Sequence, residues 1–588
     1  MISEFIKLSS NSFFYDWHVF CSFCLKTQPS DAKIYSSTFF LPFFATAQTT
    51  RIDSIFKNAG EVYFSFEVNS KVELNSISKI VSLDHGAKLP KVFAYANERT
   101  FTQFLALNIP YTPEASPGSQ FKELNMLLSL EDKQQDNWDF YPSYDVYLEM
   151  MYAFEDQYPD LCKVTSIGST VDGRELLVAK LTDSLTVAQN EPKVLYTSSM
   201  HGDEISGFVL SLRLIDFLLK NYESDPEIRS ILNNVELWIN PLANPDGTYR
   251  NNNNSIFNAS RYNANWIDLN RNYPDSEDGP HPDGNPYQPE TIAFMNFTDS
   301  VGFDLSSNFH SGAVVANYPW DTWSNITADL DWWLQVMTQY ASLAQQNSSN
   351  DYFSQYENGI TNGNEWYEVA GGRQDYMNYY EHCREFTLEL SDDKTPIGAN
   401  LPFYWEANKA SLLAYIQQSV FGLRGVVTDS LTGEALLVKV FIENYDIDNS
   451  EVYSHLPIGN YHRYLSSGVY SLTFSADEYV SKTFNNVSIL NNETTFLDVQ
   501  LVKNNLTIEE LTTQLKIYPQ PAGDFVFVAG IPEQANNVHL IDATGARVRS
   551  IKLKGSSIVL TKRNISTGQY HFVYYVNGVQ YSKSFIFE

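Results

Sequence analysis

Three side chains of this sequence have the types and settings of metal ligands. His201 and Glu204 lie in the motif MHGDE at 200–204, where a strand-like stretch gives way to a helical pattern. Zn²⁺ accepts such nitrogen and oxygen ligands, and a catalytic zinc usually has three protein ligands and one open position. His310, in NFHSG at 308–312, is the candidate third ligand because small residues follow it. Each residue alone would more often have a structural role, so the prediction of a zinc site depends on all three.

A possible anion-binding pair lies in DLNRN at 268–272. The planar guanidinium of Arg271 matches a carboxylate, and Asn270 adds neutral donors beside it. Such a pair suits the free C-terminal carboxylate of a peptide. The alternative for this segment is a polar loop with a surface ion pair.

A carboxylate that could move protons lies in EFTLEL at 385–390. The alternation of a strand places Phe386 and Leu388 on one face and Glu389 on the other, near the end of the strand. A carboxylate there could act as general base toward a water at the metal. A solvated glutamate at a strand end is the alternative.

The elements that would position these residues alternate between strand and helix patterns from about 140 to 420. Residues 194–196 and 235–239 have the pattern of short buried strands, and residues 205–221 carry apolar side chains at helical spacing. This alternation predicts an α/β catalytic domain, a mixed sheet flanked by helices. In such domains ligands bind at the carboxyl ends of the strands.

Seven motifs in this region resemble those of the zinc metallocarboxypeptidases, and most of all the carboxypeptidase N/E branch, which includes carboxypeptidases D and M. The resemblance covers about residues 140–420, in the order and spacing of the family. The motifs are HGDE at 201–204, NPDG at 244–247, RYNANWIDLNRNYPD at 261–275, QPET at 288–291, FHSGAVVANYPWD at 309–321, NGNEWYEVAGGRQD at 362–375 and FTLELSDDK at 386–394.

The resemblance implies one Zn²⁺ in the catalytic domain, bound by His201, Glu204 and His310. Arg261 matches the family's arginine that polarises the scissile carbonyl and holds the oxyanion. Glu389 matches the general base and acid, which takes a proton from the zinc-activated water and delivers it to the leaving amine.

The resemblance also implies residues that bind the substrate. Asn270 and Arg271 match the pair that grips the terminal carboxylate, and Tyr367 matches a mobile tyrosine that closes over the substrate. The expected substrates are therefore the C-termini of peptides or proteins.

A preference for C-terminal Lys or Arg follows from the same resemblance. Asp321 and Gln374 match the residues that recognise a basic side chain in the N/E branch, and Gly363 matches the small residue that leaves the pocket open. Arg373 departs from the pattern, because the branch usually has Met there. We expect its side chain to point outward, as neighbours in an extended loop tend to do.

The flanking segments are predicted to form separate units. Residues 421–502 and 515–588 have the short strands and turns of two small all-β sandwich domains. The first resembles the transthyretin-like domain that follows the catalytic domain in this branch. The second resembles the C-terminal sorting domain of type IX secretion, which implies the type IX secretion machinery as a partner.

The N-terminal part contains a small α+β unit at 49–111, either a pro-region or an accessory domain, followed by a linker at 112–139. Residues 1–47 have the pattern of a leader, with a short apolar run and small residues at its end. The mature protein is therefore expected to be secreted or displayed at the cell surface after export through the periplasm. Cys162 and Cys383 would remain, either paired or as buried thiols.

Composition excludes some classes of function. The chain carries 39 basic and 70 acidic residues, a net charge of −31. Sequence-independent binding to nucleic acid or anionic membranes requires basic patches, which argues against both. No stable membrane insertion is expected, and a monomer is the favoured state.

Two other functions remain open at this point. A peptidoglycan stem-peptide amidase or carboxypeptidase on the same fold would also meet free carboxylates. A non-enzymatic surface binding module would suit the two β-domains, but would not need a complete set of catalytic residues.

Overall fold

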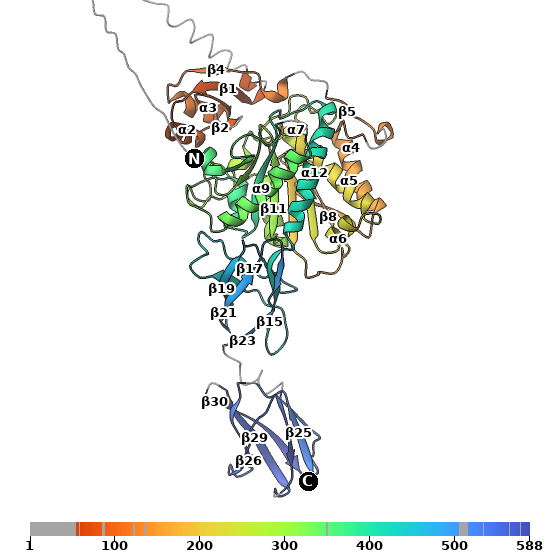
Figure 1. Ribbon diagram of the computed structural model, residues 1–588, viewed down its shortest axis with the longest axis vertical. Coiled ribbons are helices and arrows are strands. Elements are labelled where there is room, and N and C mark those ends of the chain that lie inside the picture. The colour runs from red at the N-terminus through yellow and green to blue at the C-terminus, as the bar shows by residue number, and fades with distance from the viewer. Residues whose placement is uncertain are drawn as a thin grey trace, which may run out of the picture. The chain divides into compact units, whose positions relative to one another are not determined.

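The computed structural model describes residues 55–588 except 58, 85–88, 121–123, 134–136, 349–350, 505–514, 533, 564 and 577 (Figure 1). The predicted leader, with Cys21 and Cys24, lies outside the described residues. Among the described helices, none is both long and apolar enough to cross a membrane. Both described cysteines are buried and free, so they form no disulfide.

An N-terminal domain has the α+β pattern that the sequence indicates. Its antiparallel sheet has the order β2-β3-β1-β4. The rings of Phe101 and Phe104 on the second helix lie 5.2 and 4.8 Å from that of Phe64, and all three side chains are buried. The elements are β1 (Glu61–Glu67), α2 (Lys71–Ser78), β2 (Ser82–Asp84), β3 (Lys91–Asn97), α3 (Glu98–Leu105) and β4 (Tyr111–Pro113).

The central domain is built on a mixed eight-stranded sheet with the order β13-β12-β14-β11-β9-β10-β8-β7. The strands β10, β9, β11 and β14 run parallel to one another, as expected for an α/β domain. The strands are β7 (Cys162–Ser169), β8 (Glu175–Leu181), β9 (Lys193–Ser198), β10 (Glu236–Asn240), β11 (Leu305–His310), β12 (Ala313–Tyr318), β13 (Ile360–Asn362) and β14 (Arg384–Ser391).

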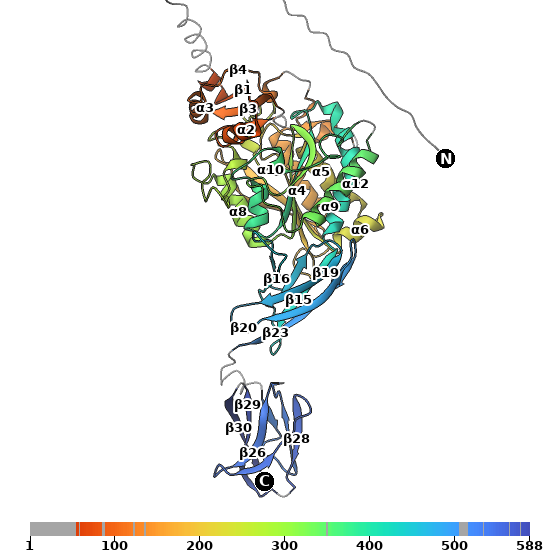
Figure 2. The same cartoon turned by 60° about the vertical axis from the view of Figure 1, so that its left-hand side comes forward.

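Helices cover both faces of this sheet, because alternate strand residues are apolar on both sides. Leu177 and Tyr196 join one core, with five helices, whereas Leu176 and Leu195 join a second core with α8 and α11. In Figure 2 α8 lies on the side of the sheet away from α12. The helices are α4 (Tyr144–Gln157), α5 (Ser206–Asn221), α6 (Pro226–Leu232), α9 (Leu330–Gln346) and α12 (Leu401–Gln418) in the first core, α8 (Pro289–Val301) and α11 (Arg373–Tyr379) in the second, and the short α7 (Pro245–Thr248) and α10 (Gly363–Trp366).

The predicted linker at 112–139 is not a free spacer. Leu124, Leu127 and Trp138 are buried and belong to the first core. The short β5 (Met126–Leu127) also pairs with β6 (Tyr141–Pro142). These apolar side chains anchor the segment, although its proline content is typical of a linker.

Two all-β units follow. Residues 422–503 form two sheets, β18-β15-β23-β20 with β22 beside β15, and β17-β16-β19-β21. Residues 516–587 form the sheets β24-β25-β28 and β27-β26-β29-β30. The strands are β15 (Gly422–Asp429), β16 (Lys439–Ile442), β17 (Val452–Tyr453), β18 (Asn460–Arg463), β19 (Gly468–Ser475), β20 (Tyr479–Val480), β21 (Lys482–Ile489), β22 (Thr494–Phe496), β23 (Val499–Lys503), β24 (Lys516–Tyr518), β25 (Phe525–Ala529), β26 (Asn536–Asp542), β27 (Arg547–Ser550), β28 (Ser557–Thr561), β29 (Gly568–Val576) and β30 (Val579–Phe587).

A buried ion network joins the first β-unit to the catalytic domain. Asp329, which precedes α9, lies 2.7 Å from Arg384 at the start of β14 and 2.9 Å from Arg463 at the end of β18. All three side chains are almost fully buried. Breaking such a pair would leave an uncompensated buried charge, so the network ties the β-unit to the strand that carries Glu389.

Candidate active site

Three predicted metal ligands converge at the carboxyl ends of neighbouring strands. His310 is the last residue of β11, and His201 and Glu204 lie in the turn between β9 and α5. One donor atom from each lies within 4.8 Å of the others. The Nδ1 atoms of the two histidines are 3.1 Å apart, and Glu204 Oε2 is 2.8 Å from His310 Nδ1. This set of two nitrogens and a carboxylate suits zinc.

The second ring nitrogen of each histidine also has a side-chain partner, and for His201 this partner is a carboxylate, as is usual for a metal-binding histidine. His201 Nε2 lies 3.1 Å from Asp268 Oδ1, and His310 Nε2 lies 2.8 Å from the side-chain amide of Asn308. These partners leave both Nδ1 atoms facing the common centre. Burial lowers the pKa of His310 to about 4, so its imidazole is neutral, the form that binds a metal.

Arg261 lies beside this centre, between two carboxylates. Its Nη1 is 3.3 Å from Glu204 Oε1, and its Nε donates to Asp268 Oδ2 at 2.9 Å. Burial opposes charge on both Arg261 and Asp268, but their pairing outweighs it, so the pKa of Asp268 stays well below its usual range. The guanidinium is therefore charged and fixed, as an oxyanion-stabilising group must be.

Glu389 lies opposite His310, because the parallel strands β11 and β14 pair these two residues in register. It lines the same cavity as the metal ligands, and its Oε2 is buried without a hydrogen-bond partner in the part of the chain that the structure describes. Burial and the nearby charge of Glu204 raise its pKa well above the usual value. A carboxylate with a raised pKa is a stronger base, which suits proton transfer near neutral pH.

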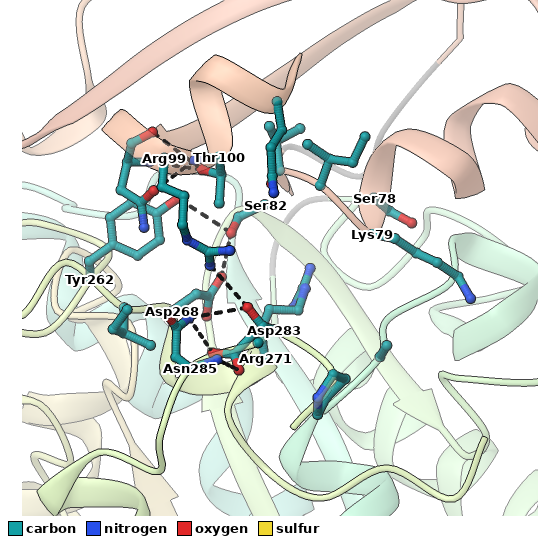
Figure 3. A pocket seen from close by; sticks show the side chains of 18 of the residues that line it. Ser78, Lys79, Ser82, Arg99, Thr100, Tyr262, Asp268, Arg271, Asp283 and Asn285 are labelled. Carbon is teal, nitrogen blue, oxygen red and sulfur yellow. Dashed lines mark hydrogen bonds between the residues drawn. The ribbon is translucent and has the colours of Figure 1, made fainter. Parts of the chain in front are cut away.

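The residues predicted to bind the substrate's terminal carboxylate line this cavity or the one next to it. Asn270 and Tyr367 line it, whereas Arg271 lines an adjacent cavity of about 300 Å³ (Figure 3). Arg271 Nη1 donates to the carbonyl of Asn270 at 2.8 Å. Its Nε and Nη2 are buried, and no described residue accepts a hydrogen bond from them. Unpaired guanidinium donors require an anion, and a carboxylate matches their geometry.

The predicted specificity pocket is built around Asp321. Its Oδ1 accepts hydrogen bonds from the side-chain amides of Asn317 and Gln374, each at 3.0 Å. A Cβ on Gly363 would lie only 1.7 Å from the same oxygen, so no other residue could stand there unless its surroundings moved. Burial raises the pKa of Asp321 to about 6. A buried carboxyl in this setting gains from a cationic partner.

The expectation that Arg373 points outward is wrong. It is the first residue of α11 rather than part of an extended loop, and its side chain is 1% exposed. Its guanidinium donates to Thr197 at 2.6 Å and to Glu385 at 3.2 Å. The ion pair with Glu385 balances the charge of Arg373.

Three residues of the site were not assigned roles from the sequence. Asp268, which orients His201 and Arg261, lies within a quoted motif but without a local signal for this role. Asp375 accepts the backbone N–H groups of Asp321 and Thr322 and so holds the pocket's backbone. Lys394, at the end of another motif, lies 2.9 Å from Glu204 Oε1.

The N-terminal domain closes the cavity. Leu83 and Asp84 of β2 line it together with the metal ligands, and only about 40 Å³ remains, room for a few water molecules. Ser82 donates to Asp268 at 2.6 Å (Figure 3), and the Tyr95 hydroxyl donates to Asp203 at 2.6 Å. The N-terminal domain therefore occupies part of the space beside the metal ligands.

The sequence of the catalytic domain is similar to those of known proteins. A sequence profile of the family described as zinc carboxypeptidase matches residues 147–411. The carboxypeptidase N catalytic chain of Mus musculus is 34% identical over 382 residues, which make up 58% of this chain and 81% of that protein. Carboxypeptidase D of Homo sapiens is 35% identical over 370 residues, 59% of this chain but only 25% of that longer protein.

Among solved structures, carboxypeptidase A from Helicoverpa armigera superposes with a TM-score of 0.47 at 17% identity, over 61% of this chain and 98% of that one.

Proposed function

Because the chain belongs to the zinc carboxypeptidase family, a family of hydrolases, we propose that it removes residues one at a time from the C-termini of peptides. The observation that carries the proposal is the convergence of His201, Glu204 and His310 beside Glu389, with the unpaired donors of Arg271 nearby. Bound zinc would supply Lewis acidity and lower the pKa of water.

Each side chain of the site has a separate role in the hydrolysis. Glu389 accepts a proton from the attacking water and donates it to the leaving amine. Arg261 stabilises the negative charge that develops on the carbonyl oxygen. Asn270, Arg271 and Tyr367 hold the free carboxylate, which makes the enzyme act on chain ends rather than inside a chain. Burial raises the pKa of Tyr367 to about 12, so its hydroxyl stays protonated and can donate to that carboxylate.

We propose residues 49–111 as a pro-region rather than an accessory domain, because Leu83 and Asp84 lie against the metal ligands. An intact chain should then be nearly inactive. We define the cut protein as the full chain with a site-specific protease sequence inserted after the exposed Ala115, folded whole and then cleaved there.

The cut protein should hydrolyse a peptide ending in Arg at least about ten times faster than the uncut protein. The reason is that two domains joined only through an interface can separate once the chain is cut. The measurement is the initial rate before and after cleavage, with an uninserted chain treated with the same protease as control. Equal initial rates before and after cleavage would overturn the pro-region assignment.

We further propose that the pocket around Asp321 selects C-terminal Lys or Arg. Asp321 has a pKa of about 6, raised by burial, so it is neutral below that pH and charged above it. The ratio of kcat/KM for a peptide ending in Arg over one ending in Phe should therefore rise as the pH increases through about 6. Taking the ratio cancels pH effects that the two peptides share, since kcat/KM reports the free enzyme.

The control for this pH dependence is Asp321→Asn, which should lower the Arg preference and remove its rise with pH. Peptides ending in Lys and Glu complete the series. A wild-type preference for Phe, or an Arg preference that persists in the variant, would contradict this pocket assignment and leave the exopeptidase proposal standing.

The flanking units suggest where the enzyme acts. We propose that residues 421–502 support the catalytic domain as a transthyretin-like unit through the Asp329 network. We propose that residues 515–588 direct secretion to the cell surface or medium through the type IX machinery. Peptide or protein C-termini outside the cell would then be the substrates.

The experiment that tests the proposed function is mass spectrometry of a pool of peptides with varied C-termini after digestion by the zinc-loaded cut protein. We expect ladders that shorten by single residues from the C-terminus, fastest for Lys and Arg ends. Products cut internally would favour an endopeptidase. Cleavage confined to peptidoglycan stem peptides would favour the amidase alternative.

A further inference from the structure

Lys394 of the catalytic domain contacts carboxylates of both the catalytic and the N-terminal domain. It lies just beyond β14, the strand of Glu389, and its side chain is fully buried. Its Nζ lies 2.9 Å from Oε1 of Glu204 and 2.7 Å from Oδ1 of Asp84, which ends strand β2 of the N-terminal domain. A buried ammonium requires anionic partners, and here each domain supplies one.

Two tyrosines of the N-terminal domain lie beside the ion pair of Asp84 and Lys394. The Tyr63 hydroxyl donates to Asp84 Oδ2 at 2.9 Å, and the Tyr95 ring lies 4.8 Å from Lys394 Nζ. Strand β2 runs in extended form from Ser82, which donates to Asp268, to Asp84, which contacts Lys394. Strand β2 therefore resembles an extended bound peptide whose acidic side chain, Asp84, contacts Lys394.

Lys394 and the specificity pocket have different contact partners. The Lys394 ammonium contacts the carboxylates of Asp84 and Glu204. The Asp321 carboxylate instead accepts hydrogen bonds from the side-chain amides of Asn317 and Gln374. If the C-terminal residue of a substrate occupies the Asp321 pocket, the residues before the scissile bond extend past the metal ligands toward Lys394.

We infer that Lys394 is a specificity-determining residue that binds an acidic side chain in the substrate segment before the scissile bond, a place that Asp84 takes in this structure. The inference rests on the proposed carboxypeptidase function and narrows its substrates to peptides with an acidic residue shortly before the C-terminal Lys or Arg. When the N-terminal domain leaves, Lys394 loses one of its two carboxylate contacts, and an acidic substrate restores it.

The test is a scan of peptides that end in Arg and carry a single Glu at each of the three positions before the scissile bond in turn. Each peptide is matched by one with Gln at the same position. We expect the cut protein to show kcat/KM about ten-fold higher for Glu than for Gln at one of these positions, the order of one hydrogen bond between charged groups. A Lys at that position should be slower than Gln.

Variants locate the effect. Lys394→Met should bring the Glu-to-Gln ratio close to one, Lys394→Arg should keep a preference, and Lys409→Met, on the surface of α12, should leave the ratio unchanged. The ratio compares two substrates of one preparation, so it does not depend on how much of a variant is folded or metal-loaded. The wild-type scan also tests the inference without any change at Lys394.

The outcomes separate this inference from the function on which it rests. Equal rates for Glu and Gln at all three positions, or a Glu preference that survives Lys394→Met, would overturn the inference and leave the carboxypeptidase function intact. No release of C-terminal residues from any peptide by the zinc-loaded cut protein would overturn both.

Discussion

Glu389→Gln should reduce kcat of the cut protein by about 10²- to 10⁴-fold while leaving zinc content and KM close to wild type. Gln has nearly the same shape but cannot accept a proton from water, and general acid–base catalysis typically contributes this much. The side chain lies in register with His310 and lines the same cavity, so the substitution changes the proton chemistry with little change in packing.

Two measurements make this result specific. Zinc content by elemental analysis shows whether the ligand set survives, since Glu389 is not one of the three ligands. Glu406→Gln, an exposed position on α12, is the matched control and should retain wild-type kcat. A Glu389→Gln protein with full zinc and near-wild-type kcat would remove Glu389 from the mechanism.

Local sequence patterns predict the metal site well because the ligands end or follow parallel strands that are neighbours in the sheet. The alternation of apolar residues identifies those strands, and their parallel arrangement brings their carboxyl ends to one edge of the sheet. His201 and His310 are therefore placed together by the sheet, although they are far apart in sequence. The pairing of His310 with Glu389 follows from the same arrangement.

Contacts that depend on long-range packing were not predictable in this way. Arg373 was expected to point outward, but a helix begins at this residue and carries its side chain to Glu385. The burial of Leu124 and Trp138 within a polar, proline-rich stretch likewise depends on the core against which they pack.

The interface over the active site has no sequence signal either. Asp84 lies in a three-residue strand of ordinary composition, and its partner Lys394 belongs to another domain. The α+β pattern predicted that an N-terminal unit exists, but not which of its surfaces meets the catalytic domain. The surface that meets the catalytic domain depends on contacts between distant segments, which include ion pairs and the aromatic cluster of Tyr63, Tyr95 and Tyr262.

Amidation of a substrate's C-terminus should lower the kcat/KM of the cut protein by a factor between about 30 and several thousand. Arg271 has two buried donors with no acceptor among the described residues, so a neutral amide would leave their positive charge without its anion. Leaving one member of a buried charge pair unpaired typically costs about 2–5 kcal/mol, which corresponds to this range.

The comparison of amidated and free peptides should depend on Arg271 itself. Arg271→Gln should slow the free peptide and have much less effect on the amidated one, because the variant no longer has a charge that requires a carboxylate. The discrimination between the two peptides would then shrink toward the few-fold level of a neutral hydrogen bond. Wild-type protein that cleaves amidated and free peptides at similar rates would show that no terminal carboxylate is recognised, and the unpaired donors of Arg271 would need another anion to explain them.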